Sequence, residues 1–181
     1  MSATENSALQ YPFLRPEFLQ ALENSKSACA QTGWEPIHLS LTTDGQESFM
    51  PLYLKDHSMG EYIFDYAWAN AYHENGLDYY PKLLTAVPFT PSIGPRVRSA
   101  ESLDQSQGEQ LFEEVLAVAA DTDASSWHCL FPDASQRALF DDSRLLQRTG
   151  VQYHWRNYDY HCFDDYMAAM NSRKRKMVRK E

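Results

Sequence analysis

An Asp-Gly pair at positions 44 and 45 restricts the fold of this chain more than any other short segment. It separates residues 37–43 from residues 46–55, and apolar and polar side chains alternate in both segments. Such a pair between alternating segments is the strongest short signal for a two-residue β-hairpin turn. We therefore predict two antiparallel strands here, and this prediction excludes an all-helical fold.

The rest of the sequence divides into helices and short strands that together amount to about one domain. Pro16 suits the first position of a helix, Gly33 and Gly76 suit helix ends, and the apolar run of residues 79–89 is typical of a strand buried on both faces. In chain order the predicted elements are helix 16–33, the hairpin, helix 65–76, strand 79–89, a helix behind Ser106, strand 125–131, helix 135–150 and strand 151–160. This order predicts an α/β fold with a central mixed sheet flanked by helices.

Two helix boundaries follow from capping patterns. Ser106 and Glu109 form a capping-box pattern in front of an apolar stripe that includes Leu111 and Val115. Gly150 is predicted to end the helix of residues 135–150.

The last residues, 163–181, predict a basic amphipathic helix. Acidic residues come early in it and basic residues late, as the helix dipole favours, and no glycine or proline stops it. We expect it to begin a linker toward a further domain. Its apolar face would be exposed and could associate with a second copy to give a homo-oligomer. The residues of that face are Phe163, Tyr166, Met167, Met170 and Met177.

Charge is unevenly distributed along the chain. The net charge is −9, and the last nine residues hold 6 of the 16 basic side chains. The other 172 residues hold 10 basic and 24 acidic side chains, a net charge of −14. Nucleic-acid binding through a broad basic face is therefore excluded, because phosphate binding needs clustered Lys and Arg. A contact with tRNA would have to use the basic tail, and the alternative for the tail is a solvated helix end.

Cysteine spacing and the first residues indicate the compartment. The cysteines at positions 29, 129 and 162 are odd in number and far apart, so we expect neither a disulfide framework nor a metal site. The amino-terminal residues lack a secretory signal, and no apolar stretch is long enough for a membrane span. We expect a cytoplasmic protein.

Four segments together resemble the FemAB-like family of peptidoglycan biosynthesis or recognition proteins, which is grouped with GNAT acyltransferases. They are MPLYLKDHSMGEYIFDYAWANAY, YYPKLLTAVPFTPSIGPR, GVQYHWRN and NSRKRKMVRKE. The resemblance implies tandem GNAT-like domains, of which residues 1–162 would form one and residues 163–181 would begin the linker to a second. It also implies transfer of an acyl or aminoacyl group to an amine, possible acceptors being cell-wall precursors. The donor substrate would be acyl-CoA or an aminoacyl-tRNA, and no firmly bound cofactor is expected.

The segment of residues 90–96 is the first candidate site. In a GNAT fold, main-chain N–H groups of a glycine-containing loop hold the donor's pyrophosphate. Here two prolines remove two of those donors, which leaves Gly94 and Arg96 as candidate anion contacts. A rigid turn with solvated arginines is the alternative.

A polar group directly after the hairpin is the second candidate site. Lys55, His57, Ser58 and Glu61 could hydrogen-bond a substrate, or could form only a polar loop. Asp56, His57 and Ser58 are adjacent in sequence, and neighbours on an extended chain point to opposite sides. We therefore do not expect a catalytic triad, and no catalytic residue is assigned.

Aromatic residues and a histidine supply the last candidates. Seven aromatic residues between positions 62 and 80 could form core or line a wet cleft, in which Asp65 and Lys82 would be the charged contacts. His154, on the predicted last strand, could act as a general base or be a structural residue. The main functional hypothesis is a domain that shapes the acceptor cleft of an N-acyltransferase. The alternative is a recognition module that binds a cell-wall precursor or an amino sugar without chemistry.

Overall fold

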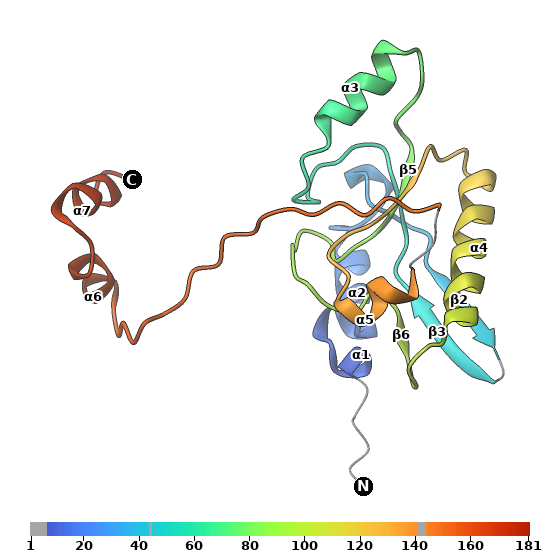
Figure 1. The fold of residues 1–181 in the computed structure, drawn as a ribbon, viewed down its shortest axis with the longest axis horizontal. Helices are drawn as coiled ribbons and strands as arrows, with labels where there is room; N and C mark the ends of the chain where they lie inside the picture. The colour runs from blue at the N-terminus through green and yellow to red at the C-terminus, as the bar shows by residue number, and fades with distance from the viewer. Residues whose placement is uncertain (1–6, 44, 141–143) are drawn as a thin grey trace, which may run out of the picture. The chain divides into compact units, whose positions relative to one another are not determined.

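The computed structural model of the chain describes residues 7–43, 45–140 and 144–181, and forms two compact units, Met1–Leu145 and Leu146–Glu181 (Figure 1). The first unit contains all the strands of the described chain and most of its helices.

Two sheets form the centre of the first unit. The larger has the order β1-β4-β5-β7, in which β5 and β7 are parallel and the other neighbours antiparallel. The smaller has the order β2-β3-β6 and is antiparallel. The strands are β1 (Glu35–Pro36), β2 (Leu39–Thr43), β3 (Gln46–Met50), β4 (Tyr53–Lys55), β5 (Lys82–Thr85), β6 (Arg98–Ser99) and β7 (Trp127–Cys129). The predicted α/β class with a mixed sheet is therefore confirmed.

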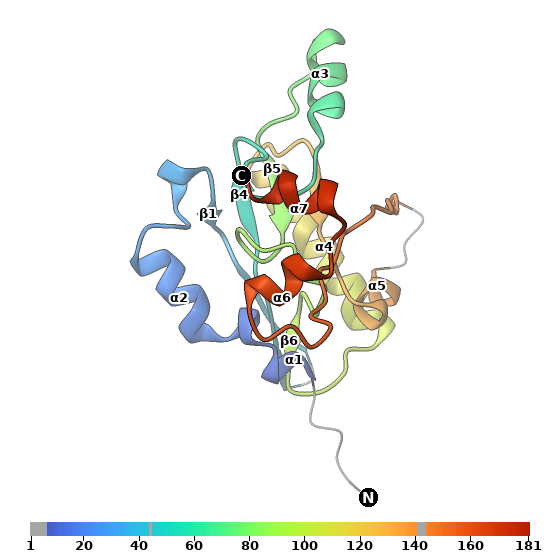
Figure 2. The same ribbon diagram turned by 90° about the vertical axis from the view of Figure 1, so that its left-hand side faces the viewer.

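Helices surround these sheets (Figure 2). They are α1 (Ser7–Gln10), η1 (Pro12–Leu14), α2 (Pro16–Asn24), η2 (Ala30–Thr32), α3 (Tyr66–Glu74), α4 (Gln105–Asp121) and α5 (Ala134–Leu139). The long helix α4 connects the parallel strands β5 and β7 by way of β6, and buries Leu111, Phe112 and Val115. Helix α3, by contrast, buries none of its residues and projects from the rest of the unit in both views.

The predicted hairpin is confirmed as β2 and β3, which pair antiparallel from Leu39 opposite Met50 to Thr43 opposite Gln46. Asp44 lies outside the described residues, and Gly45 has a φ of 78°, which a glycine adopts without steric strain. The second predicted strand, residues 46–55, is divided into β3 and β4 in the structure. Pro51, which has no N–H to donate to a neighbouring strand, lies between them. At this break the main-chain N–H of Leu52 donates to Nδ1 of His38.

Strand β5 is buried along its whole length, as its apolar sequence predicts. Leu83 on one of its faces belongs to a core with Met50 and Val115, whereas Leu84 on the other face packs with Trp34 and Tyr53. Because both faces of β5 are packed in the core, the position of Lys82 at its start is fixed as well.

The predicted helix boundaries at Gly33, Ser106 and Gly150 are wrong. The first helix ends at Asn24, and Gly33 instead ends η2 with a φ of 65°. Asp104 and Gln107, rather than Ser106 and Glu109, form the capping box of α4, because the Asp104 carboxylate accepts from the N–H of Gln107. Either pair fits the sequence pattern.

The predicted helix of residues 135–150 is shorter than expected. Helix α5 ends at Leu139, and Gly150 ends no helix. Residues 141–143 of the predicted helix lie outside the described residues.

In the second unit, the predicted strand of residues 151–160 is wrong. These residues pair with no strand of the described chain, and Tyr153 and Trp155 are exposed. Alternation alone cannot form a strand without a neighbour to supply hydrogen bonds. The single predicted helix of residues 163–181 is interrupted as well, because Asn171 caps a new helix by accepting from the N–H of Lys174.

The resulting helices are α6 (Phe163–Ala168) and α7 (Ser172–Val178), and Met167 is buried within the unit. Of the predicted apolar face, Phe163 and Met177 are exposed. The linker role of this segment stays a prediction. Among the helices of the described chain, none combines the length and apolar character needed to cross a membrane.

Candidate functional site

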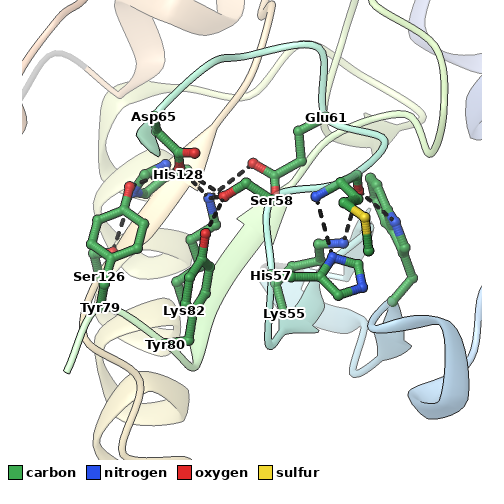
Figure 3. Close-up of polar contacts among 12 residues, drawn as sticks. Lys55, His57, Ser58, Glu61, Asp65, Tyr79, Tyr80, Lys82, Ser126 and His128 are labelled. Carbon is green, nitrogen blue, oxygen red and sulfur yellow. Dashed lines mark hydrogen bonds and ion pairs between the residues drawn. The ribbon is translucent and has the colours of Figure 1, made fainter. Parts of the chain in front are cut away.

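Strands β4 and β5 place two lysines side by side, because Lys55 at the end of β4 pairs with Lys82 at the start of β5. The segment that follows Lys55, residues 56–65, passes over this end of the sheet (Figure 3) and leads into α3. Both lysine side chains are fully buried. Burying two ammonium groups is costly unless each finds partners, so their contacts determine what the site can do.

Lys82 has three partners, all of them on the segment 56–65. Its Nζ donates to Ser58 Oγ at 2.7 Å and forms ion pairs with Glu61 at 2.9 Å and Asp65 at 2.6 Å. These three bonds use all three N–H donors of the ammonium group. One buried side chain on β5 therefore fixes three positions of a segment that has no regular structure.

Asp65 is the most heavily bonded acceptor of this group. Its Oδ2 accepts from Lys82, from the Tyr79 hydroxyl at 2.8 Å and from Ser58 at 2.9 Å. Burial would raise the pKa of this carboxyl, but the hydrogen bonds from Lys82, Tyr79 and Ser58 outweigh it and hold the pKa below its usual value. Asp65 is therefore a stable anion.

Glu61 has the opposite shift. Burial raises the pKa of its carboxyl, and the attraction of Lys82 only partly opposes that effect. Glu61 Oε1 and Asp65 Oδ1 are both buried and have no hydrogen-bond partner among the described residues. Lys82 satisfies one oxygen of each carboxylate and leaves the other without a donor.

Lys55 is the less satisfied lysine. Its Nζ lies 3.8 Å from the centre of the Trp34 ring and donates one long hydrogen bond, 3.4 Å, to the main-chain oxygen of Met59. Burial lowers the pKa of Lys55 to about 8. The attraction of Glu61 raises this pKa without cancelling the effect of burial, and the repulsion of Lys82 lowers it further. The indole face stabilises the cation that remains.

Asp56, His57 and Ser58, which are adjacent in sequence, turn in different directions in the structure. Ser58 turns inward to Lys82, and its hydroxyl lies 2.8 Å from the Tyr80 hydroxyl. His57 turns outward, with Nδ1 accepting from the N–H of Met59 and Nε2 lying 3.6 Å from Asp56. The residues of this polar group therefore face two different environments.

Arg96 and Gly94 lie elsewhere and are bonded to main chain. The Arg96 guanidinium is buried and donates to the carbonyl oxygens of Leu130 at 2.7 Å, Pro95 at 2.8 Å and Phe131 at 3.0 Å, and to Ser92. Four of its five N–H donors are thus occupied. The geometry does not support our prediction of an anion contact at Arg96, because the charge is turned into the protein.

Gly94 serves packing in the same region. A side chain at this position would collide with the ring of Tyr11, and the Gly94 N–H donates to the carbonyl of Phe131 at 3.2 Å. Its N–H is therefore not turned toward a phosphate, in addition to the two main-chain donors that the prolines of residues 90–96 remove.

His154 lies in the second unit, in the exposed segment of residues 151–160 that forms no strand. The role of general base rested on a strand that the structure lacks.

We call Lys55, Ser58, Glu61, Asp65 and Lys82 the Lys82 cluster. Exposed apolar side chains lie around this cluster, and we call Met59, Tyr62, Phe64 and Phe89 the aromatic platform. Phe89 stacks on the buried Trp34, with ring centres 5.1 Å apart, and a side chain at Gly60 would collide with it. Tyr62 and Phe89 both have φ near 60°, which is strained for a bulky residue. The sequence signalled Tyr62 and Phe64 but gave no sign that Phe89 and Met59 would join them.

The described residues hold no group of three or more His, Cys, Asp or Glu side chains placed to bind a metal ion.

Comparison with known protein families identifies the family of this chain. Residues 2–181 match the family described as FemAB-like, peptidoglycan biosynthesis/recognition. The chain belongs to this family. Searches among curated proteins and among solved structures found no significant match.

The FemAB-like chain should depend strongly on Lys82 for stability. Lys82→Met leaves Glu61 and Asp65 buried without a cation, so we expect the free energy of unfolding to fall by about 3–5 kcal/mol. Urea unfolding followed by circular dichroism measures this change. Lys26→Met, at an exposed lysine, is the control and should change the value by less than about 0.5 kcal/mol. Equal effects of the two substitutions would show that the Lys82 cluster does not hold the fold.

The lowered pKa of Lys55 predicts a pH dependence. The folded chain releases this proton near pH 8, whereas the unfolded chain keeps it until about 10.5. Between these values the unfolded state binds more protons, so the stability of the wild type should rise relative to Lys55→Met by roughly 1–3 kcal/mol. Urea unfolding of both proteins at pH 7.5 and pH 10 tests this. A stability difference that stays constant across the window would contradict it.

Arg96 should prove structural in the FemAB-like chain. Arg96→Ala leaves several buried carbonyls without donors, and we expect a loss of about 2–4 kcal/mol in the free energy of unfolding. Arg15→Ala, which removes an exposed arginine, is the matched control and should cost much less. Unchanged stability of the Arg96 variant would restore the case for a ligand contact there.

Proposed function

We propose that this chain is a GNAT-like domain of a cytoplasmic FemAB-like N-acyltransferase, and that it binds the acceptor, an amine-bearing cell-wall precursor. Family membership supports the pathway. The mixed sheet supports the fold, since α4 connects the parallel strands β5 and β7 on the pattern of one GNAT-like unit.

The observation that carries this proposal is how the aromatic platform is held. Met59, Tyr62 and Phe64 belong to the segment that Lys82 fixes through Ser58, Glu61 and Asp65. A fixed segment loses little conformational entropy when a ligand binds, so its exposed side chains are preorganised. Exposed aromatic rings, one of which carries the hydroxyl of Tyr62, suit a ligand that is partly apolar and partly polar, such as a sugar-peptide.

The donor belongs to a different part of the enzyme in this proposal. The segment of residues 90–96 turns Arg96 and the Gly94 N–H toward its own main chain, so it offers no cradle for the pyrophosphate of acyl-CoA. A second GNAT-like domain beyond the linker of residues 163–181 would bind acyl-CoA or an aminoacyl-tRNA. The basic side chains of α7 would contact the tRNA in the second case.

One observation favours a second candidate function, recognition without chemistry. Every titratable side chain of the Lys82 cluster, namely Lys55, Glu61, Asp65 and Lys82, is buried. A general base must reach the proton that it removes, and these groups do not reach the surface. The chain would then bind the cell-wall precursor as a signal and transfer nothing.

Titration calorimetry with a nucleotide-linked amino sugar that carries a peptide, and separately with acetyl-CoA, tests acceptor binding. Phe64→Ala should weaken binding of the sugar-peptide about fivefold to tenfold, because one exposed ring contributes about 1–1.5 kcal/mol. Tyr153→Ala, at an exposed aromatic residue of the second unit, should leave the affinity unchanged. Binding of acetyl-CoA alone would overturn the assignment of the acceptor to this domain.

Turnover separates the two functions. Release of free thiol from acyl-CoA, or of free tRNA from aminoacyl-tRNA, by the native full-length protein in the presence of the acceptor would support acyl transfer. Saturable binding with no turnover of either donor would support recognition.

A further inference from the structure

The strand β2 has an open edge. In the smaller sheet, of order β2-β3-β6, it pairs only with β3, and no other strand among residues 7–43, 45–140 and 144–181 pairs with it. An open edge presents main-chain N–H and C=O groups on which another extended chain can form hydrogen bonds.

The hairpin register shows which residues present these groups. Thr43 and Gln46 close the two-residue turn and so form a hydrogen-bonded pair, and such pairs alternate along an antiparallel ladder. Leu41 therefore bonds inward to β3, whereas the N–H and C=O of Ser40 and Thr42 point to the open edge. Both Ser40 and Thr42 are exposed.

A groove runs beside this edge. It has a volume of about 780 Å³ and is lined on one side by Leu41, Thr42 and Thr43 and on the other by the outer face of α4. The Thr43 hydroxyl donates to Gln110 Oε1 at 2.9 Å, which sets the position of the helix along the strand, and Figure 1 shows β2 near α4. A strand edge and a helix that together form a groove are the two walls that peptide-binding domains use for β-strand addition.

The helical wall of the groove is acidic. It presents Glu109, Glu113 and Glu114, and the single cation in the lining, Arg144, pairs with Glu113 at 2.9 Å. Three carboxylates and one guanidinium leave a net charge of −2. The floor of the groove offers Leu41, which is half-buried, so the groove combines an apolar contact with negative charge.

From these features we propose that the groove between β2 and α4 binds an extended basic peptide of another protein, which adds a strand to the open edge of β2. The peptide's main chain bonds to Ser40 and Thr42, its apolar side chains contact Leu41, and its Lys or Arg side chains face the carboxylates of α4. Main-chain bonds supply affinity, and charge supplies the choice of partner. This role does not depend on the acceptor site and holds for either proposed function.

Fluorescence anisotropy with a labelled six-residue peptide of alternating lysine and valine tests the proposal. We expect saturable binding that weakens as salt is raised, and no binding of the same peptide with glutamate in place of lysine. Thr42→Pro removes an N–H that faces the open edge and not the hairpin, so the protein should still fold. It should weaken binding at least about tenfold, as expected when a main-chain hydrogen bond is lost and the edge is blocked.

A second pair of variants tests the charge and does not depend on the proline substitution. Glu109→Lys combined with Glu114→Lys should weaken binding more than tenfold. Glu17→Lys combined with Glu74→Lys changes the net charge equally on α2 and α3, outside the groove lining, and should have little effect. Equal weakening by both pairs would reduce the interaction to general electrostatic attraction and overturn the proposal.

Two further outcomes would also overturn it. Unchanged affinity of a Thr42→Pro protein whose circular dichroism matches the wild type would show that no strand is added. Self-association of the chain at micromolar concentration that Thr42→Pro abolishes would assign the groove to a second copy of the chain instead of another protein.

Discussion

The ammonium group of Lys82 is the interaction on which the candidate site depends. A buried cation loses its hydration and must be compensated by protein groups, and Lys82 obtains this compensation from Ser58, Glu61 and Asp65. All three lie on residues 56–65, between β4 and α3, where main-chain hydrogen bonds of regular structure are absent. The conformation of that segment, and with it the display of the aromatic platform, therefore follows from satisfying one charge. A hydrophobic side chain at position 82 could fill the same volume, but it could not specify three bonding positions.

Much of the first unit was predictable from local sequence signals. The hairpin, the buried strand β5 and the helix α3 each depend on a turn residue, an apolar run or a helix period that is complete within a few residues. Lys55, Ser58 and Glu61 were named as one candidate group and Asp65 and Lys82 as another, and the structure brings residues of the two groups together. Their burial was not predictable, because it depends on contacts with residues outside the two candidate groups. Trp34 contacts Lys55 through its ring, and Tyr79 donates to Asp65. Sequence patterns identify polar residues that need partners, but not whether those partners will be protein or ligand.

The wrong predictions share one physical cause. Arg96, the strand of residues 151–160 and the capping box at Ser106 were each inferred from a pattern that two arrangements satisfy equally. An arginine in a Pro and Gly loop can bond outward to an anion or inward to carbonyls, and Leu130 and Phe131, more than thirty residues away, decide for the second. A segment of alternating apolar and polar residues forms a strand only if a neighbouring strand forms hydrogen bonds with it. Asp104 competes with Ser106 for the same helix end, and only geometry shows which carboxylate or hydroxyl reaches the N–H.

The charges of the Lys82 cluster are buried, whereas those of α4 are exposed, and the two sites have different roles for this reason. In the Lys82 cluster the ion pairs of Lys82 with Glu61 and Asp65 are buried and shorter than 3 Å, so they are insensitive to salt and hold structure. On α4 the carboxylates of Glu109 and Glu114 stand at the surface beside an open strand edge, where salt and partners can reach them. Exposed charge contributes little to stability but much to the rate and selectivity of association. The Lys82 cluster therefore fixes the conformation of the aromatic platform, whereas the carboxylates of α4 select the charge of a partner that binds at the edge of β2.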